Sequence, residues 1–399
     1  MSVAVRGSNG SSSRSTSPNG HQNGGHDNGH NKGPRRIKVG VIGCGYWGPQ
    51  LIRNIHEMAD AELVGVADTK PERLEFVRRH YPEVKLFSSH TQLLETDVEA
   101  VVVSTPIHTH HMLAKEALTA GKHVMVEKPL AASVSESVEL INIAQARNLM
   151  VMVGHTFLYN PAVQELRRLV GDGELGRVYY VDAARLNLGL FQRRANVIWD
   201  LAPHDISILM YVLGMTPVAV SARGSMCVQD DVYDVAYLEL LFESGVSAHV
   251  HVSWLDPAKV RRITVVGDKK MAVYNDVSLV EKIRVYDTGV ESPVTNNFGE
   301  FQLSYRHGQV TIPYITWQEP LRLECEHFVE CIRTGADPRT DGMQGLAVVS
   351  VLEAASDSLM HGGRRVPVEI PSLTAAAPAA APVGVDMRTP AQIGLASAS

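Results

Sequence analysis

The chain has 399 residues, of which 45% are hydrophobic and 20% are charged, and its formal net charge at pH 7 is -6. This length is enough for two domains with sizeable cores, and the composition is that of a globular protein. The negative balance, without a dense stripe of Lys and Arg, argues against a nucleic-acid partner. No apolar run approaches about 18 residues, so the sequence predicts no membrane span.

Both ends of the chain have the composition of disordered tails. Residues 1–34 are rich in Ser, Asn, Gly and His and hold too few apolar side chains to offset the entropy of ordering. The Ala- and Pro-rich residues 372–399 have the same character. The first residues contain no apolar signal core, and the four cysteines show no metal-type spacing. We therefore expect a cytoplasmic protein with reduced thiols and no bound metal.

The body of the chain divides into two parts. Residues 35–155 alternate apolar runs (IKVGVIG, AELVGVAD, AVVVSTP, HVMVEKP) with amphipathic stretches. This repetition is typical of βαβ units and predicts an α/β domain with a parallel, doubly wound sheet. Residues 156–371 become β-rich, so there we expect an α+β domain with a large, mostly antiparallel open sheet. The final helical stretches, EPLRLECEHFVECIRTG and GLAVVSVLEAASDSLMHGG, are expected to return to the first domain.

The stretch VGVIGCGYWG follows the first predicted strand and contains G-x-G-x-x-G at Gly43, Gly45 and Gly48. In this context the glycines allow a tight turn, close approach of a pyrophosphate, and close packing of helix on strand. Asp68 ends the second strand, where an acid binds the adenosine ribose and repels a 2′-phosphate. The pattern therefore predicts NAD in preference to NADP, although Lys70 leaves some tolerance for NADP.

Two short polar motifs carry the candidate chemistry. Lys128, in E-K-P, follows a strand at the carboxyl end of the predicted sheet, where ligands of open α/β sheets bind. Its ammonium could bind a substrate hydroxyl, although a lysine taken alone is more often a solvated surface residue. In WDLAPHD, Asp200 and His204 are four residues apart and share one face of a helix. A structural explanation is open here too, with Asp200 capping the helix, Pro203 in its first turn, and His204 a satisfied polar residue.

At these motifs the chain resembles the Gfo/Idh/MocA family of oxidoreductases. The resemblance rests on GVIGCGYWG, STPIHTHHMLAKEALTAGKHVMVEKPLA and WDLAPHD, and it covers nearly the whole predicted folded body. It implies a Rossmann domain followed by a substrate and oligomerisation domain, and a homodimer or homotetramer. It also implies that Lys128, Asp200 and His204 form the catalytic group of a sugar dehydrogenase.

In the activity implied by this resemblance, His204 removes the proton of a ring hydroxyl while hydride moves from the carbon to NAD. Imidazole suits this task because its pKa lies near physiological pH. Asp200 would orient the His204 ring, and Lys128 would bind the reacting oxygen. The expected cofactor contacts are Gly43, Gly45, Tyr46, Trp47, Gly48, Asp68, Thr105, Pro106, His110, Glu127 and Lys128.

Two positions depart from the family pattern. Ile107 stands where Asn is frequent after Thr-Pro, and Leu158 stands where Arg often precedes the aromatic residue. Neither change removes the implied chemistry. Both weaken the transfer of individual cofactor and substrate contacts.

The segments GCGYWGPQLIRN, VGHTFLYNPAV and RLNLG are most similar to the branch of the family that oxidises UDP-N-acetylglucosamine or its uronate at C3. We therefore expect a nucleotide sugar as substrate, with cationic side chains for its diphosphate or carboxylate. The expected substrate contacts are Lys128, Tyr159, Asn160, Arg185, Asn187, Arg193, Arg194, Asp200 and His204. A solvated role is equally open for the arginines, and an Asn-Pro turn also explains Tyr159 and Asn160.

Three other functions remain open. The nearest is a dehydrogenase of free inositols, polyols or monosaccharides that uses the same three catalytic residues. The second is an NAD-binding regulatory protein without turnover, against which the intact Lys, Asp and His argue. The third is a sugar-binding scaffold, which leaves the glycine loop and Asp68 unexplained.

Overall fold

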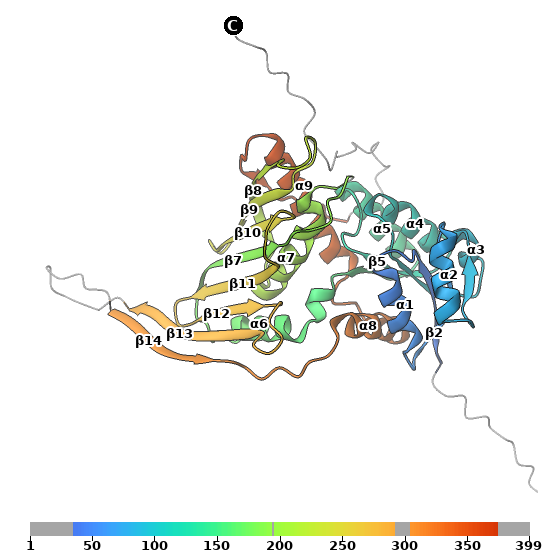
Figure 1. The fold of residues 1–399 in the computed structure, drawn as a ribbon, viewed down its shortest axis with the longest axis horizontal. Coiled ribbons are helices and arrows are strands. Elements are labelled where there is room, and N and C mark those ends of the chain that lie inside the picture. The colour runs from blue at the N-terminus through green and yellow to red at the C-terminus, as the bar shows by residue number, and fades with distance from the viewer. Residues whose placement is uncertain (1–34, 194, 292–303, 374–399) are drawn as a thin grey trace, which may run out of the picture. The chain divides into compact units, whose positions relative to one another are not determined.

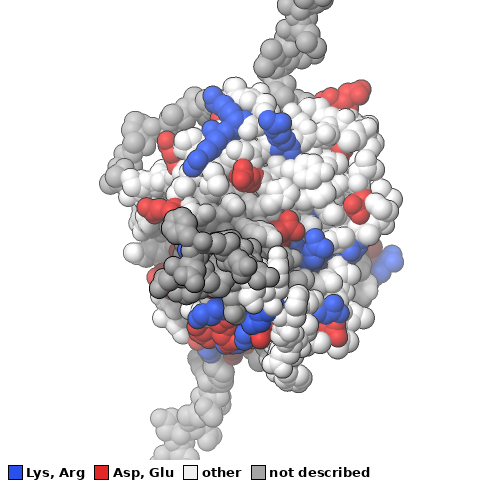
Figure 2. Space-filling view, turned by 90° about the vertical axis from the view of Figure 1, so that its left-hand side faces the viewer, with Lys and Arg blue, Asp and Glu red and all other residues white. Residues whose placement is uncertain are grey.

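The computed structural model describes residues 35–193, 195–291 and 304–373. Residues 1–34 and 374–399, where tails were predicted, lie outside the described residues, as does Arg194, an expected substrate contact. No helix in the described part is long and apolar enough to cross a membrane. On the face in Figure 2, Lys and Arg side chains are mixed with Asp and Glu, so that face carries no extended field of one sign.

A parallel first sheet has the strand order β3-β2-β1-β4-β5-β6. Its strands are β1 (Ile37–Ile42), β2 (Ala61–Ala67), β3 (Lys85–Phe87), β4 (Ala100–Val103), β5 (His123–Glu127) and β6 (Val151–Gly154). Its helical connections are α1 (Gly48–His56), α2 (Pro71–His80), α3 (His90–Leu94), η1 (Ile107–Thr109), α4 (His110–Thr119) and α5 (Val134–Ala146). The central strands β1, β4, β5 and β6 are mostly buried, as expected where helices cover both faces, whereas the edge strand β3 is not. The predicted Rossmann arrangement is confirmed, and its order reverses between β1 and β4, where ligands bind.

The second sheet has the order β14-β13-β12-β11-β7-β10-β9-β8-β15, and every pair is antiparallel except β7 with β10. Its first strands are β7 (Val178–Leu186), β8 (Pro217–Ser225), β9 (Val235–Phe242), β10 (Ser247–Ser253) and β11 (Val260–Gly267). The remaining strands are β12 (Met271–Asn275), β13 (Ile283–Glu291), β14 (Ser304–Thr311) and β15 (Val366–Pro367). The predicted large, mostly antiparallel sheet is therefore confirmed.

Helices cover one face of the second sheet (Figure 1). They are α6 (Pro161–Gly171), which follows the short helix η2 (Thr156–Tyr159), α7 (Val197–Leu213) and α9 (Gly342–Met360). α6 packs on β12, α7 on β7 and β10, and α9 on β8. Buried and more exposed residues alternate along β9 and β10 because the opposite face is left open.

The last two helices return to the first sheet, as expected. α8 (Pro320–Thr334) contacts α1 and β1, and α9 contacts α5 and β6. The backbone N–H of Val153 also donates to the carbonyl oxygen of Thr340 at 2.8 Å. These contacts fix the carboxyl edge of the first sheet against the helices of the second.

Helix α7 begins earlier than the expected cap at Asp200. Asn196 is the N-cap, and its side chain accepts hydrogen bonds from the backbone N–H groups of Ile198 and Trp199. Asn caps as well as Asp does and lies next to a buried apolar stretch, so the helix starts there. The expectation that Asp200 caps the helix with Pro203 in the first turn is wrong, because Pro203 lies in the helix interior. Asp200 is thereby free to take part in the site.

Candidate active site

The loop after β1 has the backbone shape that a dinucleotide requires. Gly43 has a φ of 97°, and a Cβ there would lie 2.3 Å from the carbonyl oxygen of Ser104. A Cβ on Gly48 would lie 2.5 Å from the carbonyl oxygen of Gly43. At Gly45, by contrast, the nearest atom to an added Cβ is 3.7 Å away, on an arginine side chain. The N-cap residue of α1 makes no side-chain hydrogen bond, so the helix N-terminus suits a diphosphate.

Asp68 follows β2 and is buried beside this loop. Its Oδ2 accepts a hydrogen bond from the backbone N–H of Cys44 at 2.7 Å, and its Oδ1 accepts one from that of Lys70 at 2.8 Å. Arg73, in the first turn of α2, places Nη1 3.3 Å from Oδ2. The acid is thus held at the loop, where it fits a dinucleotide. Arg73, which the sequence did not single out, adds a positive charge beside it.

Tyr46, Trp47, Thr105 and Pro106 surround the same loop. Tyr46 and Trp47 are exposed, and their rings pack edge to face at a centroid distance of 5.6 Å. Thr105 and Pro106 follow the carboxyl end of β4, and the Thr105 methyl group would lie 2.7 Å from a Cβ on Gly43. The structure therefore brings these four cofactor candidates to the point where the strand order reverses.

His110 differs from the expected cofactor contact. The ring is buried, with Nε2 2.8 Å from the carbonyl oxygen of Thr105 and Nδ1 2.9 Å from that of Pro129. Burial lowers the pKa of His110, so the neutral ring has a single N–H to donate to one of these carbonyls. These two contacts join the loop after β4 to the E-K-P segment, so the described role of His110 is structural.

Lys128 leaves the carboxyl end of β5 and meets α7. Its Nζ donates to the backbone carbonyl oxygen of Asp200 at 2.7 Å and lies 3.8 Å from the carboxylate Oδ1 of the same residue. The Asp200 Oδ2 accepts a hydrogen bond from Nε1 of Trp254, which follows β10, at 2.9 Å. The side chains of Lys128 and Asp200 are 13% and 29% exposed, so their interaction is only partly screened by water.

Glu127, another expected cofactor contact, is the last residue of β5 and pairs with Gly154 of β6. Burial raises its pKa to about 7. Glu324 of α8 is also buried, and burial together with the Glu127 charge raises its pKa well above the ordinary value. The hydroxyl of Thr156 donates to Oε2 of Glu324 at 2.7 Å. Burial therefore shifts the carboxyl groups of Glu127 and Glu324 towards the protonated form.

His204 lies one helical turn after Asp200 on α7 and is partly exposed. Its Nδ1 is buried and has no hydrogen-bond partner among the described residues. The His204 ring packs edge to face against the Phe157 ring, with the two ring centroids 5.0 Å apart. Burial, and then the positive charges of Lys128 and Arg185, hold the pKa of His204 well below its ordinary value. The imidazole is therefore neutral at physiological pH and can accept a proton.

The expected orientation of His204 by Asp200 differs from the structure. The Asp200 carboxylate binds Trp254 and faces Lys128, and no hydrogen bond to His204 occurs among the described contacts. Helical spacing places Asp200 and His204 on one face, but the indole N–H and the ammonium group lie closer to the short carboxylate. Asp200 thus positions Lys128 instead of the imidazole.

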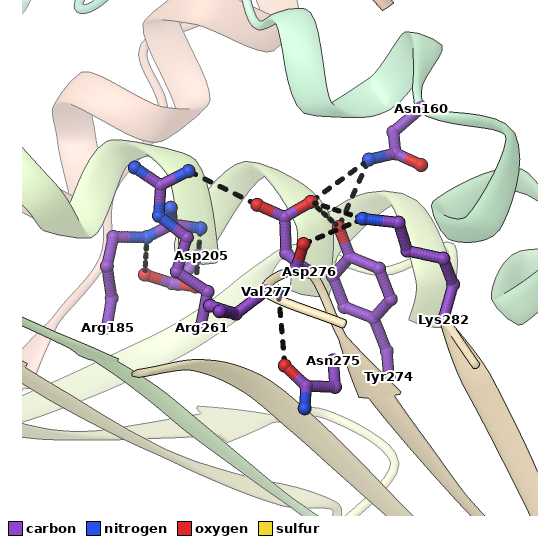
Figure 3. A network of polar contacts seen from close by, with 9 residues as sticks. All are labelled: Asn160, Arg185, Asp205, Arg261, Tyr274, Asn275, Asp276, Val277 and Lys282. Atoms are coloured by element: carbon purple, nitrogen blue, oxygen red, sulfur yellow. Dashed lines mark hydrogen bonds and ion pairs between the residues drawn. The ribbon is translucent and has the colours of Figure 1, made fainter. Parts of the chain in front are cut away.

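Arg185 also differs from its expected role. It is buried and binds Asp205 of α7 through Nε and Nη2 at 2.7 and 3.0 Å (Figure 3). Its guanidinium carbon lies 4.6 Å from the ring centroid of Phe157, which also contacts the His204 ring. This bidentate pair fixes β7 to α7 and leaves no exposed cation for a substrate. Arg193 is exposed in the loop before α7, and the backbone N–H of Asn187 donates to Ser253 at 3.2 Å.

Tyr159 and Asn160 have structural partners in place of the expected sugar contacts. Tyr159 is buried, its hydroxyl lies 3.2 Å from Oγ1 of Thr340, and burial raises its pKa. Asn160 is buried as the N-cap of α6, and its Oδ1 accepts from the backbone N–H of Ala162 at 2.9 Å. Its Nδ2 joins the polar network around Tyr274 and Asp276 (Figure 3). The Asn-Pro turn explains this segment.

Family models match both parts of the chain. The model of the oxidoreductase family with an NAD-binding Rossmann fold matches residues 37–155, and that of the GFO/IDH/MocA C-terminal domain matches residues 163–273. The chain belongs to the Gfo/Idh/MocA family. It is therefore an oxidoreductase with an NAD-binding domain.

Relatives within this family act on different substrates. A UDP-N-acetylglucosamine 3-dehydrogenase from Acidithiobacillus ferrooxidans is 33% identical over 235 residues, which are 57% of this chain and 71% of that protein. An inositol 2-dehydrogenase from Rhizobium meliloti is 25% identical over 334 residues, which are 81% of this chain and 97% of that protein. A solved structure of the Acidithiobacillus enzyme matches with a TM-score of 0.67 and 27% identity, over 81% of this chain and 98% of its own. These similarities agree with membership of the Gfo/Idh/MocA family.

The sequence analysis did not single out three residues that the structure places at the candidate site. Trp254 holds Asp200, Phe157 packs against His204, and His155 lies beside Lys128 at the edge of the first sheet. Trp254 and Phe157 carried no local signal, because an aromatic residue next to a strand is most often core. His155 stood in the quoted segment VGHTFLYNPAV, and its position directly after a strand was a usable signal.

Proposed function

We propose that this oxidoreductase uses NAD to oxidise a secondary hydroxyl of a sugar ring or polyol to a ketone. One observation carries the proposal: the Lys128 ammonium is held at Asp200, one helical turn from the neutral His204. A cation and a neutral base at the same edge as the dinucleotide loop are what removal of a hydroxyl proton requires.

Each protein group has a distinct task in this proposal. His204 accepts the hydroxyl proton, because its ring is uncharged and partly exposed. Lys128 binds the same oxygen and stabilises the negative charge that develops as the proton leaves. Asp200, itself held by Trp254, keeps the Lys128 ammonium in place. Bound NAD supplies the hydride acceptor.

We propose C3 of a UDP-N-acetylhexosamine, or of its uronate, as the site of oxidation. Support comes from the 33% identity to the Acidithiobacillus enzyme of that substrate. Arg193, exposed just before α7, is an expected substrate contact that could bind a diphosphate or carboxylate. Oxidation of a free inositol is the second candidate, because the inositol dehydrogenase matches this chain over 97% of its own length.

We propose that Asp68 selects NAD over NADP. Its carboxylate, oriented by the N–H groups of Cys44 and Lys70, would repel a 2′-phosphate. Arg73 opposes this selection because its guanidinium lies 3.3 Å from the same carboxylate. We therefore expect a preference for NAD with measurable use of NADP.

We propose that residues 156–371 bind substrate and join copies of the chain through the open face of the second sheet. Strand register places Tyr180, Tyr237 and His249 on that face. Tyr180 and Tyr237 are 48% and 45% exposed, and Tyr237 stacks on His251 at 4.3 Å. Exposed aromatic surface of this kind is typical of an interface. Light scattering at micromolar concentration should show a dimer or tetramer, and a monomer would overturn this part.

The activity is tested by NADH absorbance combined with mass spectrometry of the products. The panel contains UDP-N-acetylglucosamine, its uronate, free inositols and glucose, with a 2-oxo acid present in case reduced cofactor stays bound. A ketone from a UDP-sugar alone supports the nucleotide-sugar substrate. A ketone from a polyol alone would support the proposed catalytic roles of Lys128, Asp200 and His204 but contradict the nucleotide-sugar substrate. NAD binding without any ketone would contradict the catalytic proposal and favour a regulatory protein.

A further inference from the structure

Strand β11 carries an arginine that the proposed reaction does not use. Arg261 lies opposite Arg185 of β7 in the strand register, so both side chains leave the second sheet on the face that α7 covers. Arg185 is buried, whereas the side chain of Arg261 is 36% exposed. Its Nη1 donates to Oδ2 of Asp276 at 3.2 Å (Figure 3), and no other hydrogen bond joins its guanidinium to the described residues. Nε and Nη2 are therefore open to a ligand.

The ring of Phe157 connects Arg261 to the proposed base. The guanidinium carbon of Arg261 lies 5.9 Å from the centroid of this ring, and the centroid of the His204 ring lies 5.0 Å from it. At most one aromatic ring therefore separates the guanidinium from the imidazole. Electrostatics agrees with this placement: burial is the main cause of the lowered pKa of His204, and the charge of Arg261 is one of the smaller contributions. One sugar derivative can thus reach both groups.

The polar network around Arg261 contains more cations than carboxylates (Figure 3). Its cations are Arg185, Arg261 and Lys282, and its carboxylates are Asp205 and Asp276. Asp205 is engaged by two hydrogen bonds from Arg185. Asp276 is shared, with one oxygen 3.2 Å from Nη1 of Arg261 and the other 3.9 Å from Nζ of Lys282. One positive charge is therefore unmatched within the network. It is accessible at Arg261, because the side chain of Lys282 is only 13% exposed.

A guanidinium that is held at one nitrogen and open at the others is preorganised for a carboxylate or a phosphate. Asp276 provides the hold, and its own carboxylate accepts a hydrogen bond from the hydroxyl of Tyr274 at 3.0 Å. We propose that Arg261 binds an anionic oxygen group of the substrate, a carboxylate or a phosphate, while His204 removes the proton of a ring hydroxyl. This inference rests on the proposed function and deepens it, because it assigns the site to acidic sugar derivatives in preference to neutral polyols.

The test compares Arg261→Met with Arg261→Lys. Methionine keeps an apolar stem but removes the charge, so KM for a UDP-sugar should rise by about 10- to 100-fold while kcat changes little. Lysine keeps the charge without the planar fork, so the rise should be smaller, about threefold to tenfold. Arg364→Met is the matched control and should keep the wild-type KM, because exposed Arg364 also pairs with one aspartate, Asp357, at 2.9 Å.

The source of the anion follows from two substrates. A rise in KM confined to the uronate of UDP-N-acetylglucosamine would identify the sugar carboxylate as the group that Arg261 binds. An equal rise with UDP-N-acetylglucosamine itself would identify the diphosphate. An unchanged KM for both substrates in folded Arg261→Met would overturn the inference.

Binding is measured separately from turnover in the His204→Ala background. Calorimetry with each UDP-sugar should give a Kd that is about 10- to 100-fold higher when Arg261→Met is added. Equal Kd values with and without Arg261→Met, or a wild-type protein that oxidises only neutral polyols, would overturn the role of Arg261. Absence of any ketone product from wild-type protein would instead overturn the proposed function, and the comparison of Kd values would still decide whether Arg261 binds the anion.

Discussion

The cofactor loop and the catalytic cluster lie at the same edge of the first sheet but are built from different parts of the polypeptide. The loop is shaped by backbone, since Gly43 and Gly48 sit where a Cβ would clash with carbonyl oxygens. The cluster is made of side chains from β5, α7 and the loop after β10, joined by the Lys128–Asp200 and Trp254–Asp200 hydrogen bonds. A backbone site depends on a few adjacent residues, whereas a side-chain site depends on packing between distant segments.

The largest expected effect separates catalysis from cofactor binding. Lys128→Ala and His204→Ala should each lower kcat by about 10²–10⁴-fold, because they remove the cation or the base. NAD affinity, measured by calorimetry, should stay near the wild-type value, since the glycine loop is untouched. Lys122→Ala, whose ammonium binds Val98 at 2.7 Å near the other end of β5, is the control. Loss of NAD binding by folded His204→Ala would contradict the separation.

Gly43→Ala is expected to have the reverse effect: it should weaken NAD binding without removing a catalytic side chain. A side chain at φ 97° costs about 1–2 kcal/mol, and the methyl group would also clash with Ser104. We expect NAD affinity to fall by about 100-fold or more and the melting temperature to drop. Gly121→Ala also has a positive φ, of 78°, but open space around its Cβ, so it measures the backbone cost alone. Equal NAD affinity in the two variants would show that close approach at Gly43 is unimportant.

Glu127→Gln tests how the burial of Glu127 at the end of β5 makes the free energy of unfolding depend on pH. The pKa of Glu127 is about 7 in the folded protein, above its ordinary value of 4.5. The folded state therefore binds more protons, so the stabilisation is full below about pH 4.5 and is lost as the pH rises through about 7. From pH 5 to pH 8, denaturant unfolding should show a loss smaller by about 2 kcal/mol in the glutamine variant. Identical pH dependence in both proteins would refute the raised pKa.

The smallest expected effect concerns cofactor choice. Asp68→Ser removes the charge that repels a 2′-phosphate and leaves Arg73 in place, so the NADP-to-NAD ratio of kcat/KM should rise by about tenfold. Arg73→Ala is the matched variant and should lower that ratio. An unchanged ratio in Asp68→Ser would mean that this acid does not read the ribose.

The same division separates the features that the sequence predicted from those that it did not. The glycine loop, the strand–helix alternation and the position of Lys128 were all predicted, because each depends on residues within one short segment. The start of α7 was misplaced because two capping residues, Asn196 and Asp200, compete and only packing of the apolar residues between them decides. The expected contacts of Arg185 and Asn160 differed because each found a buried partner far away in the sequence.

The sequence by itself determined the order of elements, the dinucleotide loop and the pairing of Asp200 with His204 on one helix face, because local periodicity and glycine placement carry that information. Tertiary structure alone decided which polar groups form hydrogen bonds and ion pairs with one another. It assigned Asp200 to Lys128 and Trp254, buried Arg185 against Asp205, and brought His155 beside Lys128 through the register of β5 and β6. The physical reason is that hydrogen bonds and pKa values depend on distance and burial, which arise only when segments far apart in the sequence pack together.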